Sequence, residues 1–267
     1  MSWSLSAETL MLEGPDAAAF AHAQFSSKVD SLGIGQWQFS AWLDARGRVR
    51  AFFHLARLDS ERFLLLLRGG SAIEMTEALR RFVFRSRLDL RTLPARTLAT
   101  GQAQPTHTVS QNDDLIWLGC GTHSLAITTS NNSDEGWRPL QMCEGWPWLP
   151  PSALNALLPA ALSLQRLQAV AIDKGCYPGQ EIVARLHFRG GHKRHLHRVV
   201  LSHPMHPGEA LRIDCREAGL LLDVLSTDNH VEALAVLDDA WTSSADTGST
   251  LTCNDHMSMT IQSSWPA

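Results

Sequence analysis

Several features are scarce or absent in this sequence of 267 residues. Its five cysteines lie far apart and form no C-x-x-C pair, which excludes a disulfide framework and a compact zinc or iron–sulfur ligand set. The strongest apolar run, Phe63–Leu67, is too short to cross a bilayer, and the N-terminal stretch MSWSLSAETLML lacks the basic and apolar regions of a signal peptide. We therefore expect a cytoplasmic protein in a reducing compartment, with no membrane partner.

The short motifs that mark several enzyme classes are also missing. The sequence contains no G-x4-G-K-[ST] phosphate loop, no G-x-G-x-x-G, no H-E-x-x-H and no G-x-S-x-G. These absences argue against a P-loop nucleotidase, a Rossmann oxidoreductase, a zincin protease and an α/β-hydrolase. A net charge of −4 and a pI of about 6.3 exclude a globally basic nucleic-acid binder, although a local basic patch is compatible with them.

The composition is that of a folded globular chain. Apolar residues make up 44% and charged residues 19%, which excludes wholesale disorder. The length allows one large domain or two small ones, or three that are packed intimately. Lysine and tyrosine are rare, because 20 arginines accompany only three lysines, and Tyr177 is the only tyrosine.

The first 93 residues mix strands and helices and predict an α+β layer. Alternating or continuous apolar patterns predict strands over residues 3–12, 36–43, 48–58, 62–68 and 86–93. Gly14-Pro15-Asp16 opens a predicted helix over 17–25, and a capping box that begins at Ser71 opens another that ends near Phe84.

The rest of the chain changes in character along its length. Residues 94–112 are polar and interrupted by proline and glycine, so we expect a linker or a long loop there. Short strands are predicted over 115–118 and 124–129, a turn-rich stretch over 130–136, and one or two short helices over 137–168. Further short strands are predicted at 196–201, 210–214, 219–226, 231–237, 249–253 and 257–262. Their spacing of roughly 8–12 residues indicates a small antiparallel barrel or sandwich.

The most informative stretch reads KGCYPGQE, from Lys174 to Glu181. Two glycines and a proline around Cys176 predict a constrained turn, with Pro178 at the first position of a helix over 180–186. The helix dipole and Lys174 would then favour the thiolate of Cys176, which is the form that attacks electrophiles or binds iron and copper. The alternative is a small buried apolar side chain.

The neighbours of Cys176 have two readings each. Lys174 is a compact charge whose pKa can shift, in a chain that otherwise uses arginine, or it is an ordinary surface lysine. Glu181 faces a ligand or merely complements the helix dipole. Trp137, together with Trp146 and Trp148, forms a stacking wall for a flat heterocycle or packs in the core.

A basic segment follows, because no acid lies between Glu181 and Glu209. It holds Arg185, Arg189, Lys193, Arg194 and Arg198, with six of the twelve histidines. The segment could meet a glutamate tail, a phosphate or RNA, or it could be a solvated connector. His195 and His197 share a face of a predicted strand, but the pattern supplies no further metal ligands.

The KGCYPGQE run resembles the K-G-C-[YF]-x-G-Q-E signature of the YgfZ family, and VARLHFRG from Val183 fits its V-A-R-x-x-x-R-G continuation. Residues 14–30, 43–48, 79–90 and 137–147 resemble further family segments. The chain departs from the family's P-Q-x-x-N-L element, which here has Ala160 and Ser163 in place of the two amides.

The resemblance implies the fold of the glycine cleavage T-protein, an aminomethyltransferase. That fold has three small domains in a clover arrangement around a central folate pocket, the last being an antiparallel β-barrel. The resemblance implies an α+β domain of the folate-binding type over residues 1–93. This domain is shared with a return segment over 137–193, which carries the cysteine motif. A strand-containing subdomain or linker covers 94–136, and the barrel covers 194–267.

The resemblance also implies a function. Family members bind tetrahydrofolate and support iron–sulfur cluster assembly or repair, and one class of clients is the radical enzymes that thiolate tRNA. The implied cofactors are tetrahydrofolate or a derivative and a transient iron–sulfur cluster. The implied partners are iron–sulfur client or assembly proteins, with tRNA involved only indirectly.

Carried over by position, Cys176 is the reactive or cluster-handling thiol, with Lys174 beside it. Trp137, Tyr177, Gln180, Glu181 and Arg185 are the implied folate-binding residues. Gly175, Pro178 and Gly179 shape the turn.

Two other functions stay open. One is a true enzyme, a tetrahydrofolate-dependent aminomethyltransferase-like transferase, which would need an acidic residue aimed at the reacting amine. The other is an RNA-binding module, which rests only on the basic segment 185–198. It ranks last because no aromatic binding signature accompanies the charge.

Overall fold

The computed structural model describes residues 7–112, 115–129, 133–227, 230–242, 247–253 and 257–266. The chain divides into two compact units. The first unit holds Met1–Leu43, Arg50–Trp137 and Gln168–Pro178, and the second holds Asp44–Val49, Arg138–Leu167 and Gly179–Ala267. Strands dominate and short helices accompany them, so the predicted α+β class is confirmed.

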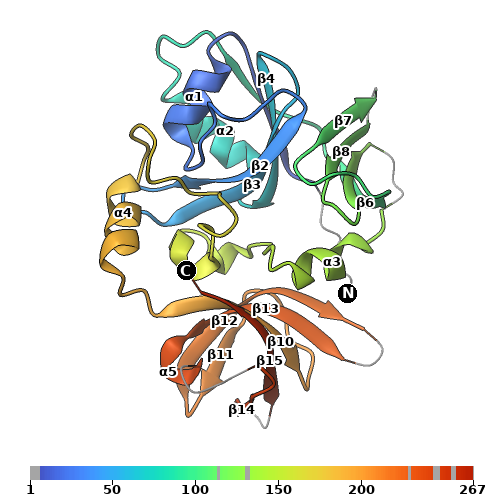
Figure 1. Ribbon diagram of the computed structural model, residues 1–267, viewed down its shortest axis with the longest axis vertical. Helices are drawn as coiled ribbons and strands as arrows, with labels where there is room; N and C mark the ends of the chain where they lie inside the picture. The colour runs from blue at the N-terminus through green and yellow to red at the C-terminus, as the bar shows by residue number, and fades with distance from the viewer. Residues whose placement is uncertain are drawn as a thin grey trace. The chain divides into compact units, whose positions relative to one another are not determined.

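An antiparallel sheet of five strands forms the larger part of the first unit (Figure 1). Its strands, in the order β2-β3-β4-β1-β5, are β1 Thr9–Glu13, β2 Gln36–Leu43, β3 Val49–Arg57, β4 Arg62–Gly69 and β5 Asp89–Thr92. Helices α1 (Ala17–Gln24) and α2 (Ala72–Arg80) pack against the sheet and close the core around Phe25, Phe53 and Phe63. The apolar run in β4 is buried along its whole length, which explains its lack of alternation.

The capping box begins α2 as expected, since the Ser71 side chain accepts a hydrogen bond from the Glu74 backbone N–H at 3.3 Å. The predicted end of this helix near Phe84 is wrong, because α2 ends at Arg80. Asp16, before α1, binds the chain that follows α2. Its carboxylate accepts from the backbone N–H of Arg87 at 2.7 Å.

A second, four-stranded sheet also belongs to the first unit. Its strands, in the order β6-β9-β8-β7, are β6 Thr97–Gly101, β7 Val109–Asn112, β8 Leu115–Gly119 and β9 Ser124–Thr128. The expected linker over 94–112 is therefore wrong in part, because it contains β6 and β7. Both are short edge strands with few buried side chains, one in β6 and none in β7, so they lack the apolar alternation that reveals a strand in sequence.

The second unit contains a curled antiparallel sheet of six strands. In the order β11-β12-β13-β10-β15-β14, they are β10 Arg194–Leu201, β11 Ala210–Ile213, β12 Arg216–Ser226, β13 Val231–Asp238, β14 Thr250–Thr252 and β15 Ser258–Trp265. The sheet forms a half-barrel whose two edges are β11 and β14. The short helix α5 (Asp239–Thr242) follows β13, and the apolar core includes Val199, Leu221 and Met259.

The chain between Arg138 and Leu167 lies in the second unit and is fixed by polar contacts. It holds most of α3 (Trp137–Cys143) and the 3-10 turns η1 (Pro151–Ala153) and η2 (Pro159–Leu162). Arg138 forms a buried ion pair with Asp223 of β12 at 2.6 Å, and both side chains are 7% exposed. In the part of the chain that the structure describes, no helix is long and apolar enough to span a membrane.

The buried ion pair gives a test of this fold. Asp223→Ala removes the buried carboxylate that pairs with the Arg138 guanidinium, so we expect a loss of about 3–5 kcal/mol in the free energy of unfolding, measured by urea denaturation. Glu13→Ala is the matched control, since it removes the exposed pair between Glu13 and Arg91, which also spans 2.6 Å. That loss should stay below about 1 kcal/mol, and equal losses in the two variants would contradict the assignment.

Candidate functional site

The segment that carries the cysteine returns to the first unit and is held there by backbone contacts. The Ala171 N–H donates to the Ser26 carbonyl at 2.8 Å, and the Ser26 hydroxyl donates to the Ala169 carbonyl at 2.6 Å. Ser26 follows α1, so the return segment lies beside the end of that helix. Residues 14–30, which the resemblance singled out without a role, therefore hold the return segment in place.

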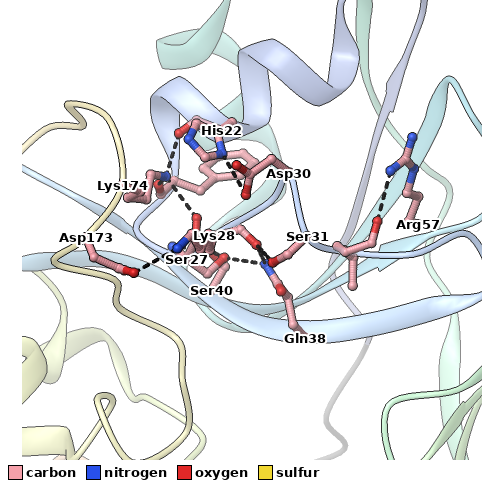
Figure 2. Close-up of polar contacts among 12 residues, drawn as sticks. His22, Ser27, Lys28, Asp30, Ser31, Gln38, Ser40, Arg57, Asp173 and Lys174 are labelled. Atoms are coloured by element: carbon pink, nitrogen blue, oxygen red, sulfur yellow. Dashed lines mark hydrogen bonds and ion pairs between the residues drawn. The ribbon is translucent and has the colours of Figure 1, made fainter.

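Lys174 anchors the segment to the end of α1. Its ammonium group donates to the backbone carbonyls of His22, Phe25 and Ser27 at 2.5, 2.6 and 2.8 Å (Figure 2). Carbonyls at a helix C-terminus lack partners within the helix and carry the negative end of its dipole, so a cation is stabilised there. The three protons of an ammonium match three converging acceptors, which a planar guanidinium does not. Burial lowers the pKa of Lys174 to about 8.

A second lysine holds the adjacent residue. Lys28 and Asp173 form an ion pair at 2.8 Å, which Figure 2 shows beside the Lys174 contacts. The hydrogen bond from Lys28 lowers the pKa of the Asp173 carboxyl. Sequence reasoning missed Lys28, although the scarcity of lysine was the signal that could have found it. Two of the three lysines in the chain therefore fix the start of the KGCYPGQE run.

Tyr177 fixes the other side of Cys176. Its ring is 6% exposed, and its hydroxyl donates to the Ala171 carbonyl at 2.8 Å, which closes the turn on itself. The Lys174 ammonium lies 4.9 Å from the centre of this ring. Burial raises the pKa of Tyr177 to about 12, so it acts here as a neutral hydrogen-bond donor.

Cys176 is exposed between these two anchored residues. The alternative of a small buried apolar side chain is therefore wrong for Cys176, whereas it describes Cys120 and Cys253, where burial raises the thiol pKa. Within the described residues, no atom lies within 4 Å of the place a Cβ would occupy at Gly175. The thiol therefore stands on a fixed turn beside open space.

The helix after the cysteine, α4, spans Gln180–Arg189 with Gly179 as its N-cap. Pro178 therefore precedes the N-cap, and its expected place at the first helical position is wrong. Gly179 has a φ of 80°, and a Cβ there would lie 2.5 Å from the Asp44 carbonyl oxygen and 2.7 Å from the Cα of Gly47. Glycine is required because the helix start touches the backbone of the 44–47 hairpin turn.

The predicted folate-binding residues differ in exposure. Glu181 and Arg185 lie on α4 and are exposed, and Gln180 is half-buried. Trp137 is 1% exposed, and its indole N–H donates to the Asp134 carbonyl at 3.0 Å. Trp146 and Trp148 are 8% and 6% exposed, so all three tryptophans are packed among other side chains. The role of Trp137 in a folate pocket stays a prediction.

The two amide positions that this chain lacks are internal to the second unit. Ala160 is 3% exposed, and the buried Ser163 hydroxyl donates to the Trp265 carbonyl. Ser163 has a φ of 51°, in the left-handed region that asparagine tolerates better than most residues. The asparagine of the family element therefore has a backbone reason to stand there.

The paired histidines of β10 have separate partners. His195 Nε2 lies 3.3 Å from the Asp239 carboxylate, and His197 Nδ1 lies 2.8 Å from the Ser264 hydroxyl. Burial lowers the pKa of His197 to about 4. Across the described ranges, no group of three or more His, Cys, Asp or Glu side chains is arranged to hold a metal ion.

The chain is similar in sequence to several known bacterial proteins. No protein-family model matches the chain. It is 28% identical over 194 residues to an uncharacterized protein of Haemophilus influenzae, covering 70% of this chain and 68% of that protein. It is 27% identical over 266 residues to the tRNA-modifying protein YgfZ of Klebsiella pneumoniae, covering 85% and 78%. The corresponding protein of Photobacterium profundum is 27% identical over 264 residues, covering 85% and 80%.

A solved structure shares the fold. The glycine cleavage system aminomethyltransferase T of Bartonella henselae matches with a TM-score of 0.72 over 96% of this chain and 82% of that one, at 16% sequence identity. This likeness confirms the expected T-protein fold. Over most of its length the chain is similar in sequence to proteins named YgfZ, and it has the fold of the glycine cleavage aminomethyltransferase.

Proposed function

We propose that this chain is a cytoplasmic folate-binding accessory protein in iron–sulfur cluster assembly or repair, with Cys176 as its functional thiol. The observation that carries the proposal is the exposed Cys176 on a turn anchored at Lys174 and Tyr177. A thiol that attacks or ligates must be reachable, and its position is best defined when its neighbours are fixed.

The surroundings of Cys176 favour a transient role over permanent ligation. Clusters are held by several cysteine ligands, and Cys176 brings no companion ligand from the described residues. A client or assembly protein would supply the other ligands. The open space at Gly175 gives such a partner access to the thiol.

Glu181 and Arg185 provide the chemistry for folate. A carboxylate accepts hydrogen bonds from the N–H groups of a pterin, and a guanidinium pairs with the carboxylates of a glutamate tail. Both side chains are exposed and make no ion pair with another described residue. Gln180 adds a half-buried amide, and Tyr177 and Trp137 add buried aromatic rings.

Relatives of this chain bear the name tRNA-modifying protein. In the accessory role, the influence on tRNA is indirect and passes through iron–sulfur enzymes, such as the radical enzymes that thiolate tRNA. When bound, tetrahydrofolate would supply one-carbon chemistry or protect the thiol.

The T-protein fold favours a second candidate, a tetrahydrofolate-dependent aminomethyltransferase-like transferase. Glu181, exposed and close in sequence to Cys176, is the carboxylate that could orient a reacting amine. Folate-dependent turnover of an aminomethyl donor by the purified chain would establish this activity in place of the accessory role.

The thiol is tested by substitution. Cys176→Ala should abolish restoration of tRNA thiolation in cells that lack the endogenous protein, while the melting temperature of the purified variant stays that of the wild type, because Cys176 is exposed. Cys143→Ala removes another exposed thiol and should retain full function. Normal thiolation with Cys176→Ala would refute the assigned role of the thiol.

Folate binding is tested by calorimetric titration with tetrahydrofolate in reducing buffer. We expect saturable binding that weakens about 10- to 100-fold in Glu181→Gln or Arg185→Gln, because a hydrogen bond to a charged group contributes about 1.5–3 kcal/mol. Glu74→Gln changes another exposed acid in the first turn of a helix and should bind normally. Trp137→Phe keeps most of the buried volume and tests the tryptophan. Absence of binding to the wild-type chain would remove folate from the proposal.

The burial of Lys174, which lowers its pKa, predicts a pH dependence of stability. Because the pKa of Lys174 is about 8 in the folded chain and ordinarily near 10.5, the unfolded chain binds this proton more tightly. The contribution of Lys174 to the free energy of unfolding should therefore rise from about pH 8 to about pH 10.5. The difference between the wild type and Lys174→Met, measured by denaturation across this range, isolates it. A pH-independent difference would exclude the assigned titration.

At neutral pH, Lys174→Met leaves three backbone carbonyls without their donor. Each unsatisfied buried acceptor costs about 1–3 kcal/mol, so the variant should be clearly less stable than the wild type.

A further inference from the structure

Most side chains of α4 are not buried. Of its ten residues, only Val183 is buried. Phe188 lies in its last turn with 76% of its surface exposed. Arg185 and Arg189 lie on the helix with it, and Lys193 follows in the loop, all three exposed. We refer to Arg185, Phe188, Arg189 and Lys193 as the α4 surface.

On α4 itself, Glu181 is the acid within reach of this surface, four residues before Arg185, and it leaves Arg189 and Lys193 without an acidic neighbour on the helix. Acids of the half-barrel pair with the neighbouring basic residues instead: Glu217 and Asp238 with Arg194, and Glu232 with Arg198. None of the three cations in the α4 surface forms an ion pair with a described residue.

The spacing of Arg185 and Arg189 on α4 brings two like charges together. Arg185 and Arg189 are four residues apart, so they are neighbours on one side of the helix, where like charges repel. An external anion would relieve this repulsion.

Phe188 changes the interpretation of the charge. Stacking of bases on exposed aromatic rings, next to cations that meet the phosphates, is the general chemistry of single-stranded nucleic acid binding. The RNA-binding function ranked last on sequence because no aromatic signature accompanied the basic segment. The structure corrects this, since an exposed phenylalanine lies three residues from Arg185 and next to Arg189.

We propose that the α4 surface binds single-stranded RNA. Phosphates contact Arg185, Arg189 and Lys193, and an unpaired base stacks on Phe188. This goes beyond the folate and thiol function, in which tRNA is affected only through client enzymes, and does not depend on it. An oligoglutamate would also meet the cations, but it has no flat ring to stack on Phe188.

A second exposed phenylalanine has arginines near it in sequence, and it serves as a control for the α4 surface. Arg81, Phe84 and Arg85 follow α2 in the first unit, and Phe84 is 85% exposed. Here, however, Glu74 and Glu77 lie on the preceding helix and Asp16 pairs with Arg87 at 3.5 Å. The charge is therefore partly balanced, and we expect this place to contribute little to RNA affinity.

The test is fluorescence anisotropy of a fluorescein-labelled oligouridylate titrated with the full chain at several salt concentrations. Arg185 is left unchanged because it belongs to the proposed folate site. Replacing Arg189 and Lys193 with glutamine should flatten the slope of log K against log salt by about 1.4, at roughly 0.7 for each lost phosphate contact. Phe188→Ala should weaken binding about 5- to 100-fold with the slope unchanged, and Phe188→Trp should restore binding.

The controls decide between a specific surface and general charge. Phe84→Ala, and Arg81 and Arg85 replaced with glutamine, should bind as the wild type does. The proposal is overturned if these variants lose as much affinity as the α4 variants, if Phe188→Ala binds normally, or if an oligoglutamate binds the α4 surface as tightly as the RNA. Cys176→Ala should bind RNA normally, and the Arg189 and Lys193 variant should bind tetrahydrofolate normally, so this proposal and the folate and thiol proposal fail separately.

Discussion

The arrangement around Cys176 depends on one ammonium group. Lys174 donates its three protons to carbonyls at and just beyond the end of α1, and this fixes the backbone two residues before the thiol. Tyr177 completes the turn from the other side. A buried lysine is tolerated because each proton has an acceptor and the helix dipole favours its charge. Cys176 is therefore exposed and at the same time well defined in position. A loop without such anchors would not combine the two.

The KGCYPGQE run crosses from one compact unit to the other between Pro178 and Gly179. Its first half is fixed to α1, and its second half begins α4 against the 44–47 hairpin turn. Gly47 and Gly179 allow these backbones to approach, since a Cβ on Gly179 would overlap the hairpin. Two motifs separated by more than a hundred residues are thus explained by one backbone contact within the second unit.

The sequence left two readings for the tryptophans, a stacking wall and core packing, and their burial favours packing. Phe188, which the pattern did not single out, is exposed among unpaired cations. Sequence patterns identify apolar residues but do not show which side of an isolated helix finds a partner. In α4, Val183 is the one buried residue, and Ile182 lies against Gly47 of the hairpin turn. The same limitation hid β6 and β7, whose edge positions remove the need for apolar side chains.

By itself, the sequence determined the α+β class, most strands and helices, and the cysteine turn as the place of interest, because periodicity, capping residues and glycine–proline spacing are local properties of the chain. It also indicated the resemblance to the YgfZ family, through a motif whose residue types are specific. Tertiary structure alone decided that Lys174 binds α1 carbonyls, that Cys176 is exposed and Trp137 is buried, and that Pro178 precedes α4. These features follow from contacts between segments far apart in the chain, and no local pattern encodes which backbone groups will meet.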